Sequence, residues 1–176
     1  DSTLVLHPTF NPKRILRLEK ERPSDILTIV PPMAKSLASL ARSDARRAIA
    51  PTVFFAGAPC SPALAEDFEA TFTSTLFAIY GTTETGAIST SWTRESKFPG
   101  VGAALKNVDV CIRNQEHYEE LGEGVGEVFV RSTSMMQGYA AQASTYQPID
   151  YWKTGDLGFW DAAGNLTLVG RIRDVI

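Results

Sequence analysis

Thr75-Leu76-Phe77-Ala78-Ile79-Tyr80 is an apolar run that leads directly into the polar stretch Gly81-Thr82-Thr83-Glu84. The run contains β-branched and aromatic residues, which favours a buried strand. Similar apolar runs precede it at 3–6, 26–30 and 53–56, and segments of helical periodicity lie between them. Strands that alternate with helices in this way predict βαβ units and therefore a parallel sheet.

The starts of two of these helices are marked by capping residues. Asn11-Pro12 and Ser61-Pro62 each place a side chain that accepts hydrogen bonds immediately before a proline. This order suits the N-cap and the first helical position. Pro31-Pro32 ends the second predicted strand. The apolar residues that recur at helical spacing after these starts are Ile15, Leu16, Leu18, Met33, Leu37, Leu40, Leu64 and Phe68.

The second half of the chain has a different pattern. Residues 108–112, 127–131 and 166–169 alternate or group apolar side chains over short runs typical of strands. The stretches 121–124 and 161–165 contain the Gly, Asp and Asn residues that hairpin turns use. We therefore expect an α/β fold in which part of a parallel sheet with flanking helices is followed by a small antiparallel β-barrel-like subdomain.

Composition excludes several classes of function. The chain has 176 residues, is 44% hydrophobic and 21% charged, and carries a formal charge of −3, which is ordinary for a globular protein. Such a charge provides no basic field for nucleic acid or for an anionic membrane. No apolar run approaches the length of about 20 residues that a membrane span needs. The two cysteines lack metal-ligand spacing, which indicates free thiols in a reducing compartment, and we expect a cytoplasmic protein.

Three short motifs carry the candidate chemistry: Tyr80-Gly81-Thr82-Thr83-Glu84, Tyr151-Trp152-Lys153-Thr154-Gly155-Asp156 and Gly170-Arg171-Ile172-Arg173-Asp174. In this order and at this spacing they resemble the adenylate-forming superfamily, which comprises acyl-CoA and aryl-CoA ligases, peptide-synthetase adenylation domains and luciferases. The resemblance covers essentially the whole chain. It implies a central fragment of the large N-terminal domain, with a parallel-sheet subdomain at 1–95, a small β-rich subdomain at 96–170 and the start of a hinge at 171–176.

The resemblance gives the stretch after the apolar run the main chemical roles. Tyr80 offers a flat face on which adenine stacks, and Gly81 lets the backbone approach the nucleotide. Thr82 lies beside them, Thr83 offers a hydroxyl to the α-phosphate, and Glu84 offers a hard oxygen ligand to Mg²⁺. Thr83 and Glu84 are the predicted catalytic residues, because carboxylate attack on a phosphate brings two anions together. The alternative is a polar turn in which Thr and Glu cap a helix.

Further nucleotide-binding residues are predicted from other segments. Gly57-Ala58-Pro59 follows an apolar run, at the strand end where ligands bind in open α/β sheets, and resembles one wall of the adenine slot. Asp156 resembles the carboxylate that accepts hydrogen bonds from the ribose diol. Arg171 and Arg173 resemble cations near ribose or phosphate. Asp174 matches the hinge about which a C-terminal domain swings. The alternatives are a strand-to-helix turn that needs glycine, a turn aspartate and ordinary surface charges.

The acyl or aryl group of the substrate is expected beyond Tyr80. The predicted wall of its pocket consists of small residues that leave room for a ligand, namely Ala78, Thr85, Gly86 and Ala87. The segments around Glu127 and around Gly138-Tyr139 resemble a further family motif, and we interpret them as structural.

The resemblance implies an ATP-dependent ligase that first forms an acyl-adenylate and then an acyl thioester. Its ligands would be ATP or AMP, Mg²⁺, a small carboxylic acid and CoA. One alternative is an adenylation domain that loads the phosphopantetheine of a carrier protein. Because the sequence lacks the glycine-rich phosphate loop with its lysine, as well as the catalytic lysine of the C-terminal domain, we expect this fragment alone to be inactive.

Two other interpretations remain open. A degenerate paralogue would act as a non-catalytic module that binds AMP or a partner protein. An inert folding fragment would expose the apolar face against which the missing half of the domain packs, and such a face predicts a dimer.

Overall fold

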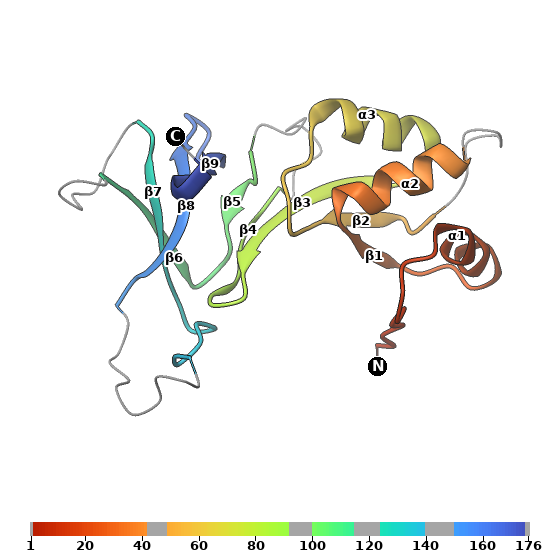
Figure 1. The fold of residues 1–176 in the computed structure, drawn as a ribbon, viewed down its shortest axis with the longest axis horizontal. Helices are drawn as coiled ribbons and strands as arrows, with labels where there is room; N and C mark the ends of the chain where they lie inside the picture. The colour runs from red at the N-terminus through yellow and green to blue at the C-terminus, as the bar shows by residue number, and fades with distance from the viewer. Residues whose placement is uncertain (1, 42–48, 92–99, 115–123, 140–149, 175–176) are drawn as a thin grey trace. The chain divides into compact units, whose positions relative to one another are not determined.

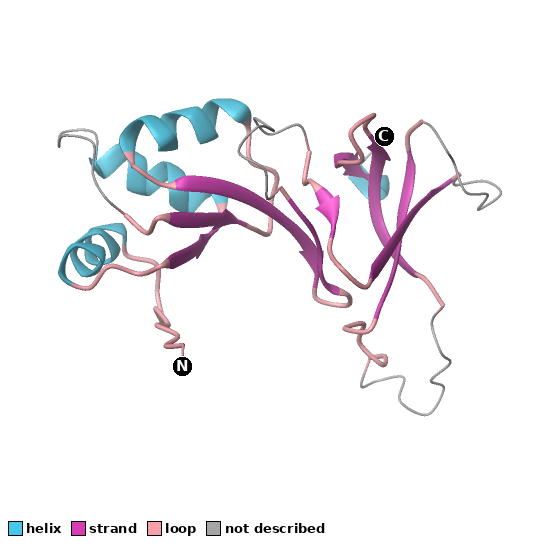
Figure 2. Ribbon diagram, turned by 180° about the vertical axis from the view of Figure 1, so that it is seen from behind, coloured by secondary structure: helices cyan, strands magenta, loops and turns pink. Residues whose placement is uncertain are grey.

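The computed structural model describes residues 2–41, 49–91, 100–114, 124–139 and 150–174 (Figure 1). The chain divides into two compact units, Asp1–Leu76 and Phe77–Ile176. The predicted division at residues 95 and 170 concerns subdomains of a larger protein and stays a prediction. Within the described residues, the α-helices all belong to the first unit, whereas the second consists of strands, turns and one 3-10 helix (Figure 2).

The first unit alternates helices and strands as predicted. Its helices are α1 (Pro12–Glu21), α2 (Pro31–Ala41) and α3 (Pro62–Thr71), and its strands are β1 (Ile26–Ile29) and β2 (Thr52–Phe55). The two strands are parallel, with Ile26 opposite Thr52 and Ile29 opposite Phe55. The strand β3 (Thr75–Thr82) begins beside them, because the Thr75 amide donates to the carbonyl of Pro51 over 2.8 Å. The α/β class with a parallel sheet is therefore confirmed.

The predicted helix caps are present in the structure. The Asn11 side chain accepts a hydrogen bond from the Arg14 amide at 3.0 Å, and the Ser61 hydroxyl accepts one from the Leu64 amide at 3.3 Å. A proline follows each cap at the start of its helix. These bonds satisfy amides that have no partner inside a helix, which fixes where α1 and α3 begin.

Aromatic packing forms the core of the first unit. Phe68 of α3 lies edge-on to Phe55 of β2, with ring centroids 5.6 Å apart, and its ring centroid is 4.6 Å from that of Phe72. Leu37 of α2 is fully buried. Helix α3 therefore packs against β2, directly before the loop that follows this strand.

The strand predicted at residues 3–6 is wrong. The segment has no regular secondary structure, and Leu4, Val5 and Leu6 are exposed. An apolar run favours a strand only where another strand or helix covers it, and no pairing involves these residues in the described part of the chain.

The second unit contains two sets of antiparallel strands. The end of β3 pairs with β4 (Gly86–Thr90), and β4 pairs with β5 (Ala103–Ala104). The other set is a four-stranded sheet in the order β6-β7-β8-β9. Its strands are β6 (Val108–Arg113), β7 (Gly126–Ser132), β8 (Trp152–Trp160) and β9 (Leu166–Arg171), followed by the 3-10 helix η2 (Ile172–Asp174). The antiparallel strands are confirmed, and β4, β5 and β8 are strands that the sequence analysis did not predict.

A shared core joins these two sets of strands. Tyr80 and Ile88 pack with residues of the four-stranded sheet, namely Ile112, Val128, Val130 and Leu166. The backbone of Leu166 also exchanges hydrogen bonds with Val101 and Gly102, at 2.7 and 2.8 Å. β9 is thereby tied to the segment before β5. The predicted turn at 161–165 is confirmed, since it connects β8 to β9, whereas part of the predicted turn at 121–124 lies outside the described residues.

Among the described residues, every helix falls short of the length and hydrophobicity that a bilayer crossing requires.

Candidate nucleotide site

The polar stretch at the end of β3 leads into a tight turn that connects β3 to β4. The register of the β3–β4 pair shifts between Tyr80 and Gly81. A Cβ atom at Gly81 would lie 2.4 Å from the carbonyl oxygen of Gly86, so only glycine fits there. Inside the turn, the Thr82 hydroxyl accepts a hydrogen bond from the Thr85 amide at 3.2 Å. The turn is therefore held by its own side chains as well as by strand pairing.

A buried carboxylate lies beside the end of this strand. Asp156 of β8 accepts a hydrogen bond from the Tyr80 hydroxyl, with 2.7 Å between Oη and Oδ2. Its other oxygen, Oδ1, lies 2.8 Å from Nε of Arg171, which is opposite Asp156 in the β8–β9 pair. The Asp156 side chain is 7% exposed and that of Arg171 is 44% exposed. Residues from all three predicted motifs therefore meet at this carboxylate.

The environment of Tyr80 fixes the proton on its hydroxyl. Burial raises the pKa of Tyr80 far above its ordinary value, and the hydrogen bond to Asp156 raises the pKa further. The hydroxyl therefore remains a donor to Asp156 at neutral pH. Thr154 supports the same segment, since its hydroxyl accepts from the Asp156 amide at 3.1 Å and donates to the Val128 carbonyl at 2.9 Å.

Glu84 is held at both its backbone and its side chain. Its carbonyl accepts a hydrogen bond from the Met136 amide at 2.7 Å, and its Oε1 accepts one from the Tyr139 hydroxyl at 3.0 Å. A hydrogen bond from its own backbone amide and the one from Tyr139 lower the pKa of Glu84. The carboxylate is therefore charged at neutral pH, as a metal ligand must be.

The donor set around Glu84 fits Mg²⁺ bound together with a phosphate. Within the described ranges, no three His, Cys, Asp or Glu side chains come together as a metal cage. Mg²⁺ is often bound through only one or two carboxylates plus the phosphates of a substrate. A single charged carboxylate on a turn rich in threonine hydroxyls matches that mode better than it matches zinc or calcium binding.

The remaining predicted nucleotide-binding residues belong to other segments of the chain. Gly57, Ala58 and Pro59 lie in the first unit, exposed, directly after β2, and Gly57 has a φ of 76°. Arg173 and Asp174 lie in η2, where both side chains are exposed and their charged atoms are 3.9 Å apart. Their roles in adenine binding and in a hinge stay predictions. Thr83 is an exposed residue of the turn.

The residues predicted for the acyl pocket lie on β3, the turn and β4. Ala78 is buried, and its amide donates to the Ser91 hydroxyl at 2.7 Å. Thr85 is fully buried, Gly86 has a φ of 72°, and Ala87 is exposed. The Thr85 side chain donates to the Gly86 carbonyl at 3.1 Å. Their role as a pocket wall stays a prediction.

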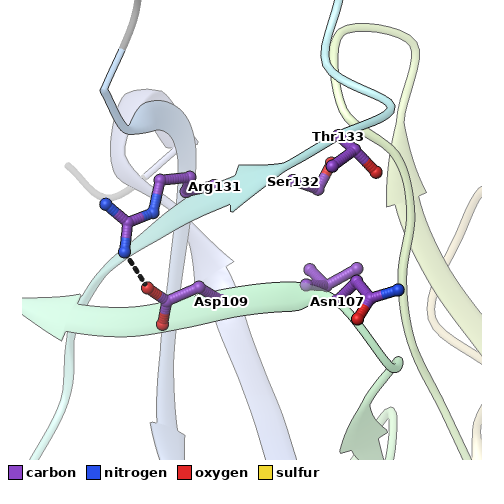
Figure 3. A pocket seen from close by; sticks show the side chains of 6 residues that line it. Asn107, Asp109, Arg131, Ser132 and Thr133 are labelled. Carbon is purple, nitrogen blue, oxygen red and sulfur yellow. Dashed lines mark hydrogen bonds and ion pairs between the residues drawn. The ribbon is translucent and has the colours of Figure 1, made fainter.

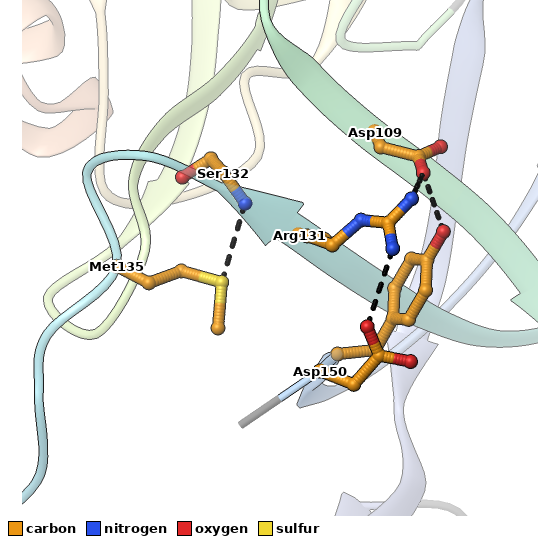
Figure 4. A network of polar contacts seen from close by, with 6 residues as sticks. Asp109, Arg131, Ser132, Met135 and Asp150 are labelled. Atoms are coloured by element: carbon orange, nitrogen blue, oxygen red, sulfur yellow. Dashed lines mark hydrogen bonds and ion pairs between the residues drawn. The ribbon is translucent and has the colours of Figure 1, made fainter. Parts of the chain in front are cut away.

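A second polar cluster lies where β6 and β7 pair, toward the edge of the four-stranded sheet that is opposite to β9. A shallow pocket there is lined by Asn107, Val108, Asp109, Arg131, Ser132 and Thr133 (Figure 3). Arg131 bridges two carboxylates, Asp109 at 2.7 Å and Asp150 at 3.2 Å (Figure 4). The Tyr151 hydroxyl also donates to Asp109. The motif that contains Tyr151 therefore contributes to both clusters, through Tyr151 to the one around Asp109 and through its own Asp156 to the other.

Sequence reasoning missed the segment that supports the turn. The hydroxyls of Ser132 and Ser134 donate to the Thr85 carbonyl at 3.3 and 2.8 Å, and Tyr139 binds Glu84. The Gly138-Tyr139 motif was a usable signal, but it was interpreted as a structural turn. Its contact with Glu84 joins residues 55 positions apart, which no local pattern reveals.

Comparison with known proteins assigns the family. A model of the family described as AMP-binding enzymes matches residues 2–140. The 4-coumarate–CoA ligase-like protein 2 of Arabidopsis thaliana is 30% identical over 99% of this chain and 33% of its own length. The mouse mitochondrial medium-chain acyl-CoA ligase ACSF2 is 33% identical over 57% of this chain and 18% of its own.

Solved structures give the same assignment. The amide bond synthetase McbA from Marinactinospora thermotolerans is 31% identical, with a TM-score of 0.78 over 95% of this chain and 35% of its own. ATP-bound MatB from Rhodopseudomonas palustris is 25% identical, with a TM-score of 0.79 over 97% of this chain and 35% of its own. The chain thus spans about a third of the length of these relatives. On the match over residues 2–140, the chain belongs to the family of AMP-binding enzymes.

Proposed function

We propose that this chain carries the nucleoside-binding part of an ATP-dependent acid–thiol ligase that forms an acyl-adenylate and then an acyl thioester. The observation that carries the proposal is the buried Asp156 carboxylate, which is held by Tyr80 and Arg171. A carboxylate has about four lone-pair sites. Two donors occupy part of this capacity, so the oxygens retain sites for the two hydroxyls of a ribose.

The other nucleotide contacts follow from the same assignment. The guanidinium of Arg171, which is 44% exposed, offers a cation to ribose or phosphate. Gly57, Ala58 and Pro59 would form the adenine wall, Tyr80 its aromatic partner, and Arg173 a further cation. Asp174 would serve as the hinge of a C-terminal domain.

Thr83 and Glu84 carry the chemical step in this proposal. The attacking carboxylate and the α-phosphate are both anionic, so the reaction requires positive charge and aimed donors. Bound Mg²⁺ would neutralise part of that charge. Glu84 would hold the ion through a charged oxygen, the Thr83 hydroxyl would donate to the phosphate, and Ala78, Thr85, Gly86 and Ala87 would border the acyl group.

The acceptor is proposed to be CoA, because curated relatives of the chain are named CoA ligases. The similarity to an amide bond synthetase favours an amine acceptor as the second candidate, with the same adenylate as intermediate. Loading of a carrier protein, a non-catalytic AMP-binding module, a dimer and a cytoplasmic location stay predictions. We also propose that the phosphate loop and the catalytic lysine belong to a longer protein.

Isotope exchange between pyrophosphate and ATP tests adenylate formation. The exchange would be measured with a panel of aromatic and aliphatic carboxylic acids, for the chain alone and for the longer protein. We expect acid-dependent exchange only in the longer protein, with at least a hundredfold loss in Glu84→Gln, and a product formed on addition of CoA. Exchange that needs no acid, or that survives Glu84→Gln unchanged, would contradict the proposal. A product formed with amines but not with CoA would favour the second candidate.

A further inference from the structure

The segment from Ser132 to Tyr139 holds the turn that carries Glu84. The hydroxyl of Ser134 lies 2.8 Å from the Thr85 carbonyl and 3.0 Å from the hydroxyl of Ser132. A Cβ at Gly86 would lie 3.1 Å from the same Ser134 hydroxyl, so the segment packs closely against the turn. The contact fixes the backbone on the C-terminal side of Glu84.

Two further bonds from this segment reach Glu84 itself. The Met136 amide donates to its carbonyl at 2.7 Å, and the Tyr139 hydroxyl donates to its Oε1 at 3.0 Å. The first bond fixes where the residue lies, and the second selects the direction of its carboxylate. Glutamate on a surface turn otherwise has several side-chain rotamers of similar energy.

The ring of Tyr139 is itself placed by a neighbour on β8. It meets Trp152 in an edge-on arrangement, with ring centroids 6.2 Å apart and planes inclined at 62°. Such aromatic pairs have a preferred geometry and restrict both rings. Trp152 lies four residues before Asp156 on the same strand. Tyr139 therefore couples the orientation of the Glu84 carboxylate to the strand that holds the buried carboxylate.

We propose that Tyr139 is a positioning residue for Glu84, and that its hydroxyl holds the carboxylate in the orientation in which it receives the Mg²⁺ of the nucleotide. The inference rests on the proposed function. Groups that hydrogen-bond to metal ligands orient them and raise metal affinity, and their loss costs about 10- to 100-fold. The bonds from its own amide and from Tyr139 occupy only part of the roughly four lone-pair sites of Glu84, so the carboxylate keeps capacity for the cation.

The test separates the hydroxyl of Tyr139 from its ring. Tyr139→Phe removes the bond to Glu84 and keeps the contact with Trp152. Tyr151→Phe is the matched control, because it removes a tyrosine hydroxyl from a different carboxylate, Asp109, on the same unit. The affinity of each variant would be measured by calorimetry, for ATP over a series of Mg²⁺ concentrations and for AMP without metal.

We expect Tyr139→Phe to need about tenfold more Mg²⁺ for half-maximal ATP binding, with AMP affinity unchanged and ATP affinity restored at high Mg²⁺. Tyr151→Phe should match the parent chain. A purely structural role would weaken AMP and ATP binding together. A double-mutant cycle with Glu84→Ala, measured by urea unfolding without ligand, adds a second readout, because alanine removes the acceptor that glutamine would keep. A coupling of zero would show that the hydroxyl does not hold Glu84.

The outcomes distinguish this inference from the proposed function. If Glu84→Gln abolishes the Mg²⁺ dependence while Tyr139→Phe retains that of the parent, the inference alone is overturned. If the parent chain shows no Mg²⁺ dependence, or Glu84→Gln leaves it unchanged, the proposed role of Glu84 fails and the role of Tyr139 fails with it.

Discussion

Two clusters in the second unit use the same three residue types. In one, Asp156 accepts from the Tyr80 hydroxyl and pairs with Arg171. In the other, Asp109 accepts from the Tyr151 hydroxyl and pairs with Arg131. The Asp156 side chain is 7% exposed, whereas that of Asp109 is 50% exposed. The bonds are alike, so burial is the main difference between the clusters.

That difference in burial decides how much each cluster contributes to stability. Water solvates Asp109 and Arg131 whether or not they meet, so their ion pair contributes little to stability. Asp156 has lost most of its water, and the loss of either partner would leave a buried charge poorly compensated. The exposed cluster gains contacts from stacking instead, since the guanidinium carbons of Arg113 and Arg131 each lie 4.7 Å from the Tyr151 ring centroid. The buried cluster is therefore the more rigid, as a preformed ligand site must be.

Replacing each aspartate by alanine should give the largest contrast. Asp156→Ala leaves the buried Tyr80 hydroxyl without its acceptor and should lower the free energy of unfolding by about 3 kcal/mol, the low end of the range for buried pairs because Arg171 is partly exposed. Asp109→Ala should have a much smaller effect. Urea unfolding followed by circular dichroism measures both. Equal losses would mean that burial does not separate the clusters.

Removing the tyrosine hydroxyl should also destabilise the protein more in the buried cluster than in the exposed one. The difference between the two variants should be smaller than for the aspartates. Tyr80→Phe keeps the ring in the core and removes one donor to a buried carboxylate, at a cost of about 1–2 kcal/mol. Tyr151→Phe should change stability less, because water replaces the lost donor. Thermal unfolding of the two variants beside the parent chain makes the comparison. A greater loss in Tyr151→Phe would reverse the proposed ranking.

The exposed cluster should make a small contribution to stability that depends on pH. The Tyr151 hydroxyl and the Arg131 guanidinium lower the pKa of Asp109, so its contribution is present above its ordinary pKa and is lost as the pH falls through the lower, folded pKa. The bond to Asp109 raises the pKa of Tyr151 to about 12, so its contribution is present below the ordinary value and lost as the pH rises through about 12.

Unfolding of the parent chain and of Tyr151→Phe between pH 3 and pH 10 checks the acid side of this window. We expect the variant to lose less stability than the parent at the acid end, because part of the acid-sensitive contribution is already absent. Parallel curves for the two proteins would exclude the hydroxyl as a source of that dependence.

Local chemistry accounts for the parts of the fold that were predicted correctly. The caps at Asn11 and Ser61 and the turn at 161–165 depend on neighbouring residues, so the sequence contains their whole cause. The strand at 3–6 failed because its outcome depends on what covers it. Strand β8 was missed because its residues include Gly155 and Gly158 and show no clear alternation.

The candidate site was predicted as a set of residues and not as a set of contacts. The motifs identified Tyr80, Asp156 and Arg171, and the structure brings all three together. That the Tyr80 hydroxyl binds Asp156 was not predicted, because the contact spans 76 positions and depends on how β8 packs beside β3. The contact of Tyr139 with Glu84 was missed for the same reason.

Calorimetric titration of this chain with AMP tests the central claim most directly, with Asp156→Asn and Asp109→Asn as a matched pair. Asparagine keeps the shape of either side chain and removes its charge. The account predicts that AMP binds the parent chain and Asp109→Asn alike, and that Asp156→Asn weakens binding at least tenfold while remaining folded. Equal AMP affinity in all three proteins, or no binding by a folded parent chain, would contradict the assignment of the nucleoside to Asp156.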